Sequence, residues 1–203
     1  MNLLVKRNLV IVIALLLSPQ LYSQTDSVNN SMFYYDSSAN LSSFKKKFKD
    51  KPLSRINLKS FTGEMIDTDQ LKGKVAVIYF WTPSCGACIA GFPQLNKLKE
   101  KYATDVHFIG IAPDTKQEVQ SVLNKFKFEF KNIAEAESLV KELNIVEYPK
   151  LFFIDKKGII RIVEEGVPVK TKADGTIDRV NGKIQFTAFE RYSPFLDEII
   201  KAK

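Results

Sequence analysis

The sequence predicts an α/β fold in which a mixed sheet carries helices on both faces. Short apolar runs typical of buried strands occur at Val75–Trp81, Val106–Ala112 and Leu151–Ile154. The segments between them repeat apolar residues at helical spacing. The third run continues through the turn residues Asp155–Gly158 into Ile159–Val163, which predicts an antiparallel hairpin beside the alternating strands and helices.

The first residues have the pattern of a signal peptide. Lys6 and Arg7 precede the apolar run Leu9–Leu17, and the small residue Ser23 follows. Nine apolar residues are too few to cross a bilayer, so we expect residues 1–23 to be a cleaved signal peptide. The protein is then expected to be exported, most simply to the periplasm. An uncleaved membrane anchor is the alternative.

The residues that follow are expected to form a spacer and one domain. Residues 24–50 are rich in Ser, Asn and Lys without a sustained period, so we expect a tail or spacer with one short helix near its end. The domain is expected over residues 51–203. It begins with a short hairpin around the turn at Thr62-Gly63.

Helices are expected at four places in this domain. Apolar residues recur at helical spacing over Ile89–Tyr102 and again over Ala136–Leu143. A capping box at Thr115–Glu118 opens another helix between them. The last helix is expected to start at Ser193-Pro194, with serine as N-cap and proline in the first helical position.

Residues 165–191 form a long connection before the last helix. Asn181-Gly182 separates two alternating segments, Thr176–Val180 and Lys183–Phe189, as in a two-residue hairpin. This added C-terminal hairpin either recognises a partner or is a tolerated surface insertion, and the sequence leaves both interpretations open.

The formal net charge of +7 does not indicate a nucleic-acid partner. The basic residues are spread along the chain rather than gathered with aromatic residues, and an exported protein meets little nucleic acid. We interpret the excess charge as a solvated surface.

Cys85 and Cys88 are the only cysteines of the chain. If a helix starts there, its unpaired N–H groups and dipole stabilise a thiolate on Cys85. A purely structural staple over so short a loop would contribute only about 2 kcal/mol. A metal site lacks further ligands, because there is no third cysteine and His107 is the only histidine. Redox exchange is therefore the favoured interpretation.

Two motifs identify a family resemblance. The segments Phe80–Pro93, which holds Trp-Thr-Pro-Ser-Cys-Gly-Ala-Cys, and Tyr148–Gly158, which begins Tyr-Pro-Lys-Leu-Phe-Phe, resemble the thioredoxin-like fold. More narrowly, they resemble exported thiol–disulfide oxidoreductases of the TlpA/ResA type, within the AhpC/TSA-related group. The resemblance spans Leu53–Val163 and implies no cofactor and no metal.

The resemblance also implies roles for individual residues. Cys85 would be the exposed attacking thiol, and Cys88 the buried resolving thiol. Pro149 would be a cis-proline beside the disulfide, and Trp81, Tyr148 and Pro149 would border the bound substrate. The partners would be thiols or disulfides of exported proteins, with electrons supplied by a membrane thiol carrier.

The chain departs from the family where an acid is usual. Thioredoxins carry an Asp at the position of Tyr79, and TlpA/ResA relatives often carry a Glu at the position of Gly91. Either the proton of the buried thiol would pass to water, to the Tyr79 phenol or to a carboxylate such as Glu147, or exchange would be slow. No histidine stands between the cysteines to stabilise a thiolate, which favours a reducing or isomerising enzyme over a strong oxidant.

Two other functions compete with exchange. The spacing Thr82-x-x-Cys85 matches part of the peroxiredoxin motif, although Ile78 stands where those peroxidases carry proline. The second alternative is a non-catalytic binding module in which the thiols are incidental. The sequence does not determine the oligomeric state.

Overall fold

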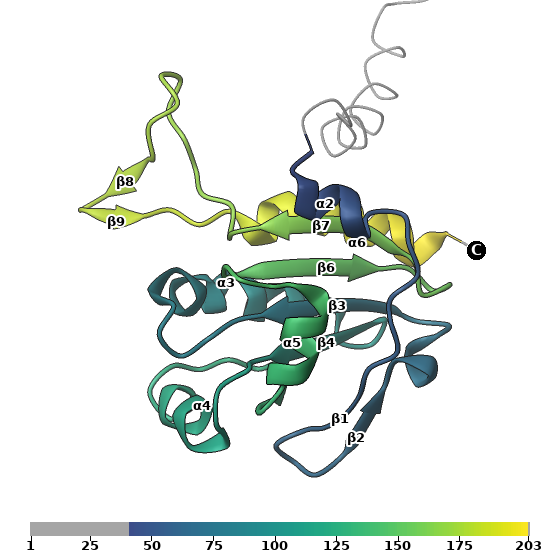
Figure 1. Ribbon diagram of the computed structural model, residues 1–203. Coiled ribbons are helices and arrows are strands. Elements are labelled where there is room, and N and C mark those ends of the chain that lie inside the picture. The colour runs from purple at the N-terminus through teal and green to yellow at the C-terminus, as the bar shows by residue number, and fades with distance from the viewer. Residues whose placement is uncertain (1–40, 203) are drawn as a thin grey trace, which may run out of the picture. The chain divides into compact units, whose positions relative to one another are not determined.

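The computed structural model describes residues 41–202 and has mixed α/β architecture (Figure 1). The predicted signal peptide and most of the spacer lie outside the described residues. The helices are α2 Ser43–Phe48, η3 Thr68–Leu71 (a 3₁₀ turn), α3 Gly86–Tyr102, α4 Lys116–Leu123, α5 Glu137–Leu143 and α6 Ala188–Lys201. The strands are β1 Asn57–Lys59, β2 Met65–Asp67, β3 Val75–Phe80, β4 Val106–Ile111, β5 Lys131–Ile133, β6 Lys150–Ile154, β7 Ile160–Glu165, β8 Arg179–Val180 and β9 Lys183–Ile184. Within the described part of the chain, no helix is long and apolar enough to cross a membrane.

The central sheet has five strands in the order β5-β4-β3-β6-β7. β3 pairs in parallel with β4 and antiparallel with β6, so the predicted mixed sheet is confirmed. All six residues of β3 are buried, as the unbroken apolar run predicts for a strand covered on both faces.

Helices cover both faces of this sheet, as the sequence predicts. Because successive side chains of a strand point to opposite faces, neighbouring residues of β3 contact different helices. Tyr79 packs on Phe92 of α3, with ring centroids 6.4 Å apart. Phe80 and its neighbour Phe152 belong instead to the hydrophobic cluster that includes α2 and α5.

Helix α2 is part of the folded domain although its residues were expected in the spacer. Phe48 is 9% exposed, and its ring centroid lies 5.0 Å from that of Phe152 in β6. Lys45 forms an ion pair of 3.0 Å with Glu164, a buried acid of the edge strand β7. No local pattern indicates this packing, because Phe152 and Glu164 lie more than 100 residues along the chain from Phe48 and Lys45.

Both predicted short hairpins are present. β1 pairs antiparallel with β2, and β8 pairs antiparallel with β9. Asn181 and Gly182 have φ angles of 51° and 77°, the left-handed values that a tight two-residue hairpin turn requires. The segment from Gly166 to Thr187, which we call the arm, carries β8 and β9 away from the central sheet (Figure 1).

The start of the last helix differs from the prediction. α6 begins at Ala188 rather than at Ser193-Pro194, so Pro194 lies inside the helix. Its missing N–H leaves one helical hydrogen bond unmade. The earlier turn is retained because Ala188 and Tyr192 are fully buried, with the Tyr192 ring centroid 4.6 Å from that of Phe153 in the sheet. The burial of Ala188 and Tyr192 against the sheet therefore outweighs the preference of Pro194 for the first position of a helix.

The packing of α2 predicts that Phe48→Ala destabilises the domain. Removing a buried aromatic ring leaves a cavity against Phe152, so the free energy of unfolding in urea should fall by about 3 kcal/mol. Phe126→Ala removes the same atoms from a ring that is 47% exposed, and should change it by less than about 0.5 kcal/mol. Equal effects of the two substitutions would contradict the structural role of α2.

Candidate active site

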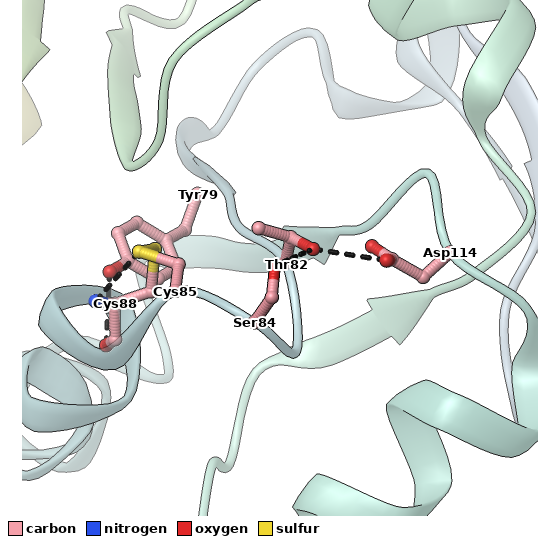
Figure 2. Close-up of a disulfide and its surroundings, with 6 residues drawn as sticks. All are labelled: Tyr79, Thr82, Ser84, Cys85, Cys88 and Asp114. Atoms are coloured by element: carbon pink, nitrogen blue, oxygen red, sulfur yellow. Dashed lines mark hydrogen bonds between the residues drawn. A yellow bond between two sulfur atoms is a disulfide. The ribbon is translucent and has the colours of Figure 1, made fainter.

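Cys85 and Cys88 form a disulfide where β3 gives way to α3 (Figure 2). β3 ends at Phe80, and α3 begins at Gly86 with Cys85 as its N-cap. The Cα atoms of the two cysteines are 5.2 Å apart. The buried strand thus delivers the first cysteine to the start of a helix, as the sequence predicts.

The two sulfur atoms lie in different environments. The Cys85 sulfur accepts a hydrogen bond of 3.1 Å from the backbone N–H of Cys88, and the residue is half-buried. Cys88 is 0% exposed. A helix N-terminus stabilises a thiolate on Cys85, whereas burial away from water disfavours one on Cys88. Only Cys85 is placed to meet a partner's disulfide.

The peptide bond between Tyr148 and Pro149 is cis, and it immediately precedes β6. Pro149 is buried and Tyr148 half-buried. The Pro149 carbonyl accepts a hydrogen bond of 2.9 Å from the N–H of Gly166, the first residue of the arm. This hydrogen bond therefore joins the arm directly to Tyr148-Pro149, which we call the proline loop.

Trp81 belongs to the core beneath the disulfide. Its ring is 0% exposed and meets Phe92 of α3 edge-on, with centroids 5.2 Å apart. Phe128 stacks on Phe92 at 4.1 Å. The ring supports the first turns of α3 and does not face solvent, so a bound partner would not contact it directly in this arrangement.

Tyr79 does not supply a base for the Cys88 thiol. Its hydroxyl donates a hydrogen bond of 3.1 Å to the carbonyl oxygen of Cys88 (Figure 2). Burial raises the pKa of the phenol far above its ordinary value, so the group stays protonated. Its role is to hold the first turn of α3 against the sheet.

Glu147 does not supply a base for the Cys88 thiol either. Its side chain is 82% exposed and lies 3.9 Å from the ammonium group of Lys150. Lys150 is nearly buried and pairs more closely with Glu165, at 3.0 Å. Lys150 also lies 4.9 Å from the centroid of the Phe44 ring. The carboxylate of Glu147 therefore points to solvent at the edge of the sheet.

Gly91 faces the arm. A Cβ atom at this position would lie 2.7 Å from a methyl carbon of Val167, closer than real Cβ contacts. Val167 thus occupies the space beside Gly91 into which a side chain would project, where TlpA/ResA relatives often carry a glutamate. The residue that fills it comes from the arm, 76 positions further along the chain.

Asp114 is a site residue that the sequence analysis missed. Thr82, three residues before Cys85, donates a hydrogen bond of 3.0 Å to the Asp114 carboxylate, and Ser84 lies 3.4 Å from the Thr82 hydroxyl (Figure 2). Burial and the negative charge of Asp114 raise the pKa of Tyr148. The signal for Asp114 is its place just after β4, because parallel pairing brings the ends of β3 and β4 together.

A metal site is not apparent near the disulfide. Over residues 41–202, no group of three or more His, Cys, Asp and Glu side chains could hold a metal ion. His107 lies half-buried in β4, where burial is the main cause of its lowered pKa.

The sequence model of the AhpC/TSA family matches residues 49–163, which hold both cysteines and the cis-proline. The chain belongs to that family. The thiol:disulfide interchange protein DsbE of Pseudomonas fluorescens biotype C is 29% identical over 73% of this chain and 78% of its own length. The bcp protein of Coxiella burnetii, whose name places it among the peroxiredoxins, is 33% identical over 60% of this chain and 88% of its own length.

Solved structures support the thioredoxin-like fold. The thioredoxin domain of a thiol-disulfide oxidoreductase from Bacteroides vulgatus superposes with a TM-score of 0.54 at 18% identity. The match covers 58% of this chain and 89% of that domain. The predicted fold class is confirmed.

The geometry of Tyr79 predicts that Tyr79→Phe lowers stability without removing exchange. Losing one buried hydrogen bond should reduce the free energy of unfolding of the oxidised protein by about 1 kcal/mol. The rate at which the reduced protein cleaves a small aromatic disulfide should stay close to that of the unmodified protein. A rate loss of about a hundredfold, the lower range for a lost general base, would instead make Tyr79 a proton acceptor.

Proposed function

We propose that this thiol–disulfide oxidoreductase is exported and that it reduces or isomerises disulfides of other exported proteins. The observation that carries the proposal is the asymmetric cysteine pair, with half-exposed Cys85 at the start of α3 and Cys88 fully buried behind it. The similarity to DsbE supports the same reaction.

The reaction proceeds in two exchanges. The Cys85 thiolate attacks a partner disulfide, so that a Cys85–partner bond forms and one partner sulfur leaves as a thiolate. The Cys88 sulfur, after losing its proton, then attacks the Cys85 sulfur and releases the second partner thiolate. The protein ends with the 85–88 disulfide, and the partner has gained two electrons and, from solvent, two protons.

The cis-proline loop is proposed to border the bound partner. Tyr148 is half-buried beside Pro149, and Asp114 links the loop before Cys85 to this side of the site. Trp81 is proposed to act from the core by supporting α3. A membrane thiol carrier would return electrons to the disulfide, because an exported protein has no cytoplasmic reductant.

A peroxidase is the alternative, and two observations favour it: the similarity to bcp and the spacing Thr82-x-x-Cys85. The hydrogen bonding of Thr82 argues against a peroxidase, because the Thr82 hydroxyl donates its hydrogen bond to Asp114 and not to the Cys85 sulfur. Peroxide consumption that needs Cys85 but not Cys88 would establish the peroxidase instead.

The exchange mechanism predicts that Cys88→Ala traps partners. Without the resolving thiol, the Cys85–partner bond persists after mixing with a scrambled disulfide protein, and it should appear as a covalent adduct on non-reducing gels. Cys85→Ala is the matched control and should form no such adduct. Equal trapping by both variants, or by neither, would contradict the assigned roles.

The direction of exchange is tested by a glutathione redox titration. Since no histidine lies between the cysteines, we expect a reduction potential below about −180 mV, in or below the range of disulfide isomerases. A value near −120 mV, typical of strong oxidants, would overturn the reducing or isomerising assignment.

A further inference from the structure

The root of the arm meets the active site at two points. Gly166 donates its N–H to the carbonyl of Pro149, and the next residue, Val167, packs against Gly91 of α3. Gly166 has a φ of 109°, which lets the chain leave β7 in this direction. The arm is therefore attached to the site by its first two residues.

The contact with Gly91 places Val167 against the side of α3 on which Cys88 also lies. Residues three apart on a helix lie on the same face, so Cys88 and Gly91 share one side of α3. A side chain at position 91 would project into the space that Val167 fills, because the added Cβ would come within 2.7 Å of its methyl carbon. An apolar side chain from the arm thus lies on the face of α3 that carries Cys88.

The surroundings of Cys88 make this contact chemically important. Cys88, Trp81 and Phe92 are all 0% exposed. A thiol buried away from water loses its proton with difficulty, because the thiolate is poorly solvated there. Tyr79 stays protonated and Glu147 points to solvent, so neither relieves that cost. Water reaching the buried sulfur would have to displace an enclosing side chain.

We propose that Val167 is a positioning residue that seals Cys88 and slows the second exchange. The inference rests on the proposed function. The first exchange at Cys85 does not depend on Val167. In the second, Cys88 gives its proton to solvent and its sulfur forms the bond to Cys85 while the Cys85–partner bond breaks. A slow second step lengthens the life of the mixed disulfide, which allows a second partner thiol to attack it and rearrange the partner's disulfides.

The probe for this proposal is 5,5′-dithiobis(2-nitrobenzoic acid) mixed rapidly with the fully reduced, folded protein. Attack by Cys85 releases one thionitrobenzoate, and resolution by Cys88 releases the second. The two steps are therefore read as separate phases of absorbance. The rate of the first phase tests the proposed exchange function. Only the rate of the second phase tests whether Val167 slows the attack by Cys88.

Val167→Ala should accelerate the second release by about tenfold, the change in thiolate population that one pKa unit gives, and leave the first unchanged. Val180→Ala, the same substitution at a 53% exposed position of the arm, should change neither phase. Val167→Thr keeps the shape of the side chain but adds a hydroxyl that can bind water, and should also accelerate the second release.

The pH profile distinguishes a seal from a general loosening of the fold. The second release should rise with pH, because Cys88 must lose a proton, and its midpoint should lie at lower pH in Val167→Ala and Val167→Thr than in the unmodified protein. Acceleration of both phases, an unchanged midpoint, or the same effect from Val180→Ala would overturn the proposal. Absence of the first phase in the unmodified protein would instead overturn the proposed function.

Discussion

Burial of β3 is the constraint on which the rest of the site depends. All six residues of the strand are buried between two layers of helices, so its end has one position relative to the sheet. Trp81 continues that burial, and its backbone N–H donates a hydrogen bond of 3.0 Å to the carbonyl of Ile111. The next turn places Cys85 at the N-cap of α3. The packing of the core therefore fixes the position of the Cys85 sulfur at the N-terminus of α3.

The site is assembled from chain segments that lie next to the ends of four neighbouring elements. Cys85 follows β3, Asp114 follows β4, Pro149 precedes β6 and Val167 follows β7. Parallel pairing of β3 with β4, and antiparallel pairing of β3 with β6 and of β6 with β7, bring these strand ends to the same end of the sheet. The same topology gives the two sulfurs different surroundings, because Cys85 lies at that edge and Cys88 lies beneath it.

Charged side chains fix β7, from which the arm departs. Glu164 pairs with Lys45 of α2 and with Arg191 of α6, so one buried acid connects a helix from each face of the sheet. Glu165 pairs with Lys150 and accepts a hydrogen bond from Ser42. Both acids immediately precede Gly166. These interactions hold the root of the arm next to the proline loop, whereas its tip extends away from the sheet.

The sequence by itself determined the strands of the central sheet other than β5, most helices and the position of the cysteine pair, because these depend on local spacing: apolar runs, helical periods and the C-x-x-C of Cys85 and Cys88. The resemblance supplied Pro149. The tertiary structure alone decided the start of α6, the docking of α2, the contact of Asp114 with Thr82 and the packing of Val167 on Gly91. Each of these contacts joins segments that are distant in the chain. Such contacts stabilise the fold but produce no periodic pattern in the sequence from which they could be predicted. For the same reason, the sequence left open which group takes the proton of the Cys88 thiol. The surroundings of Tyr79 and Gly91, on which this depends, are set by tertiary contacts.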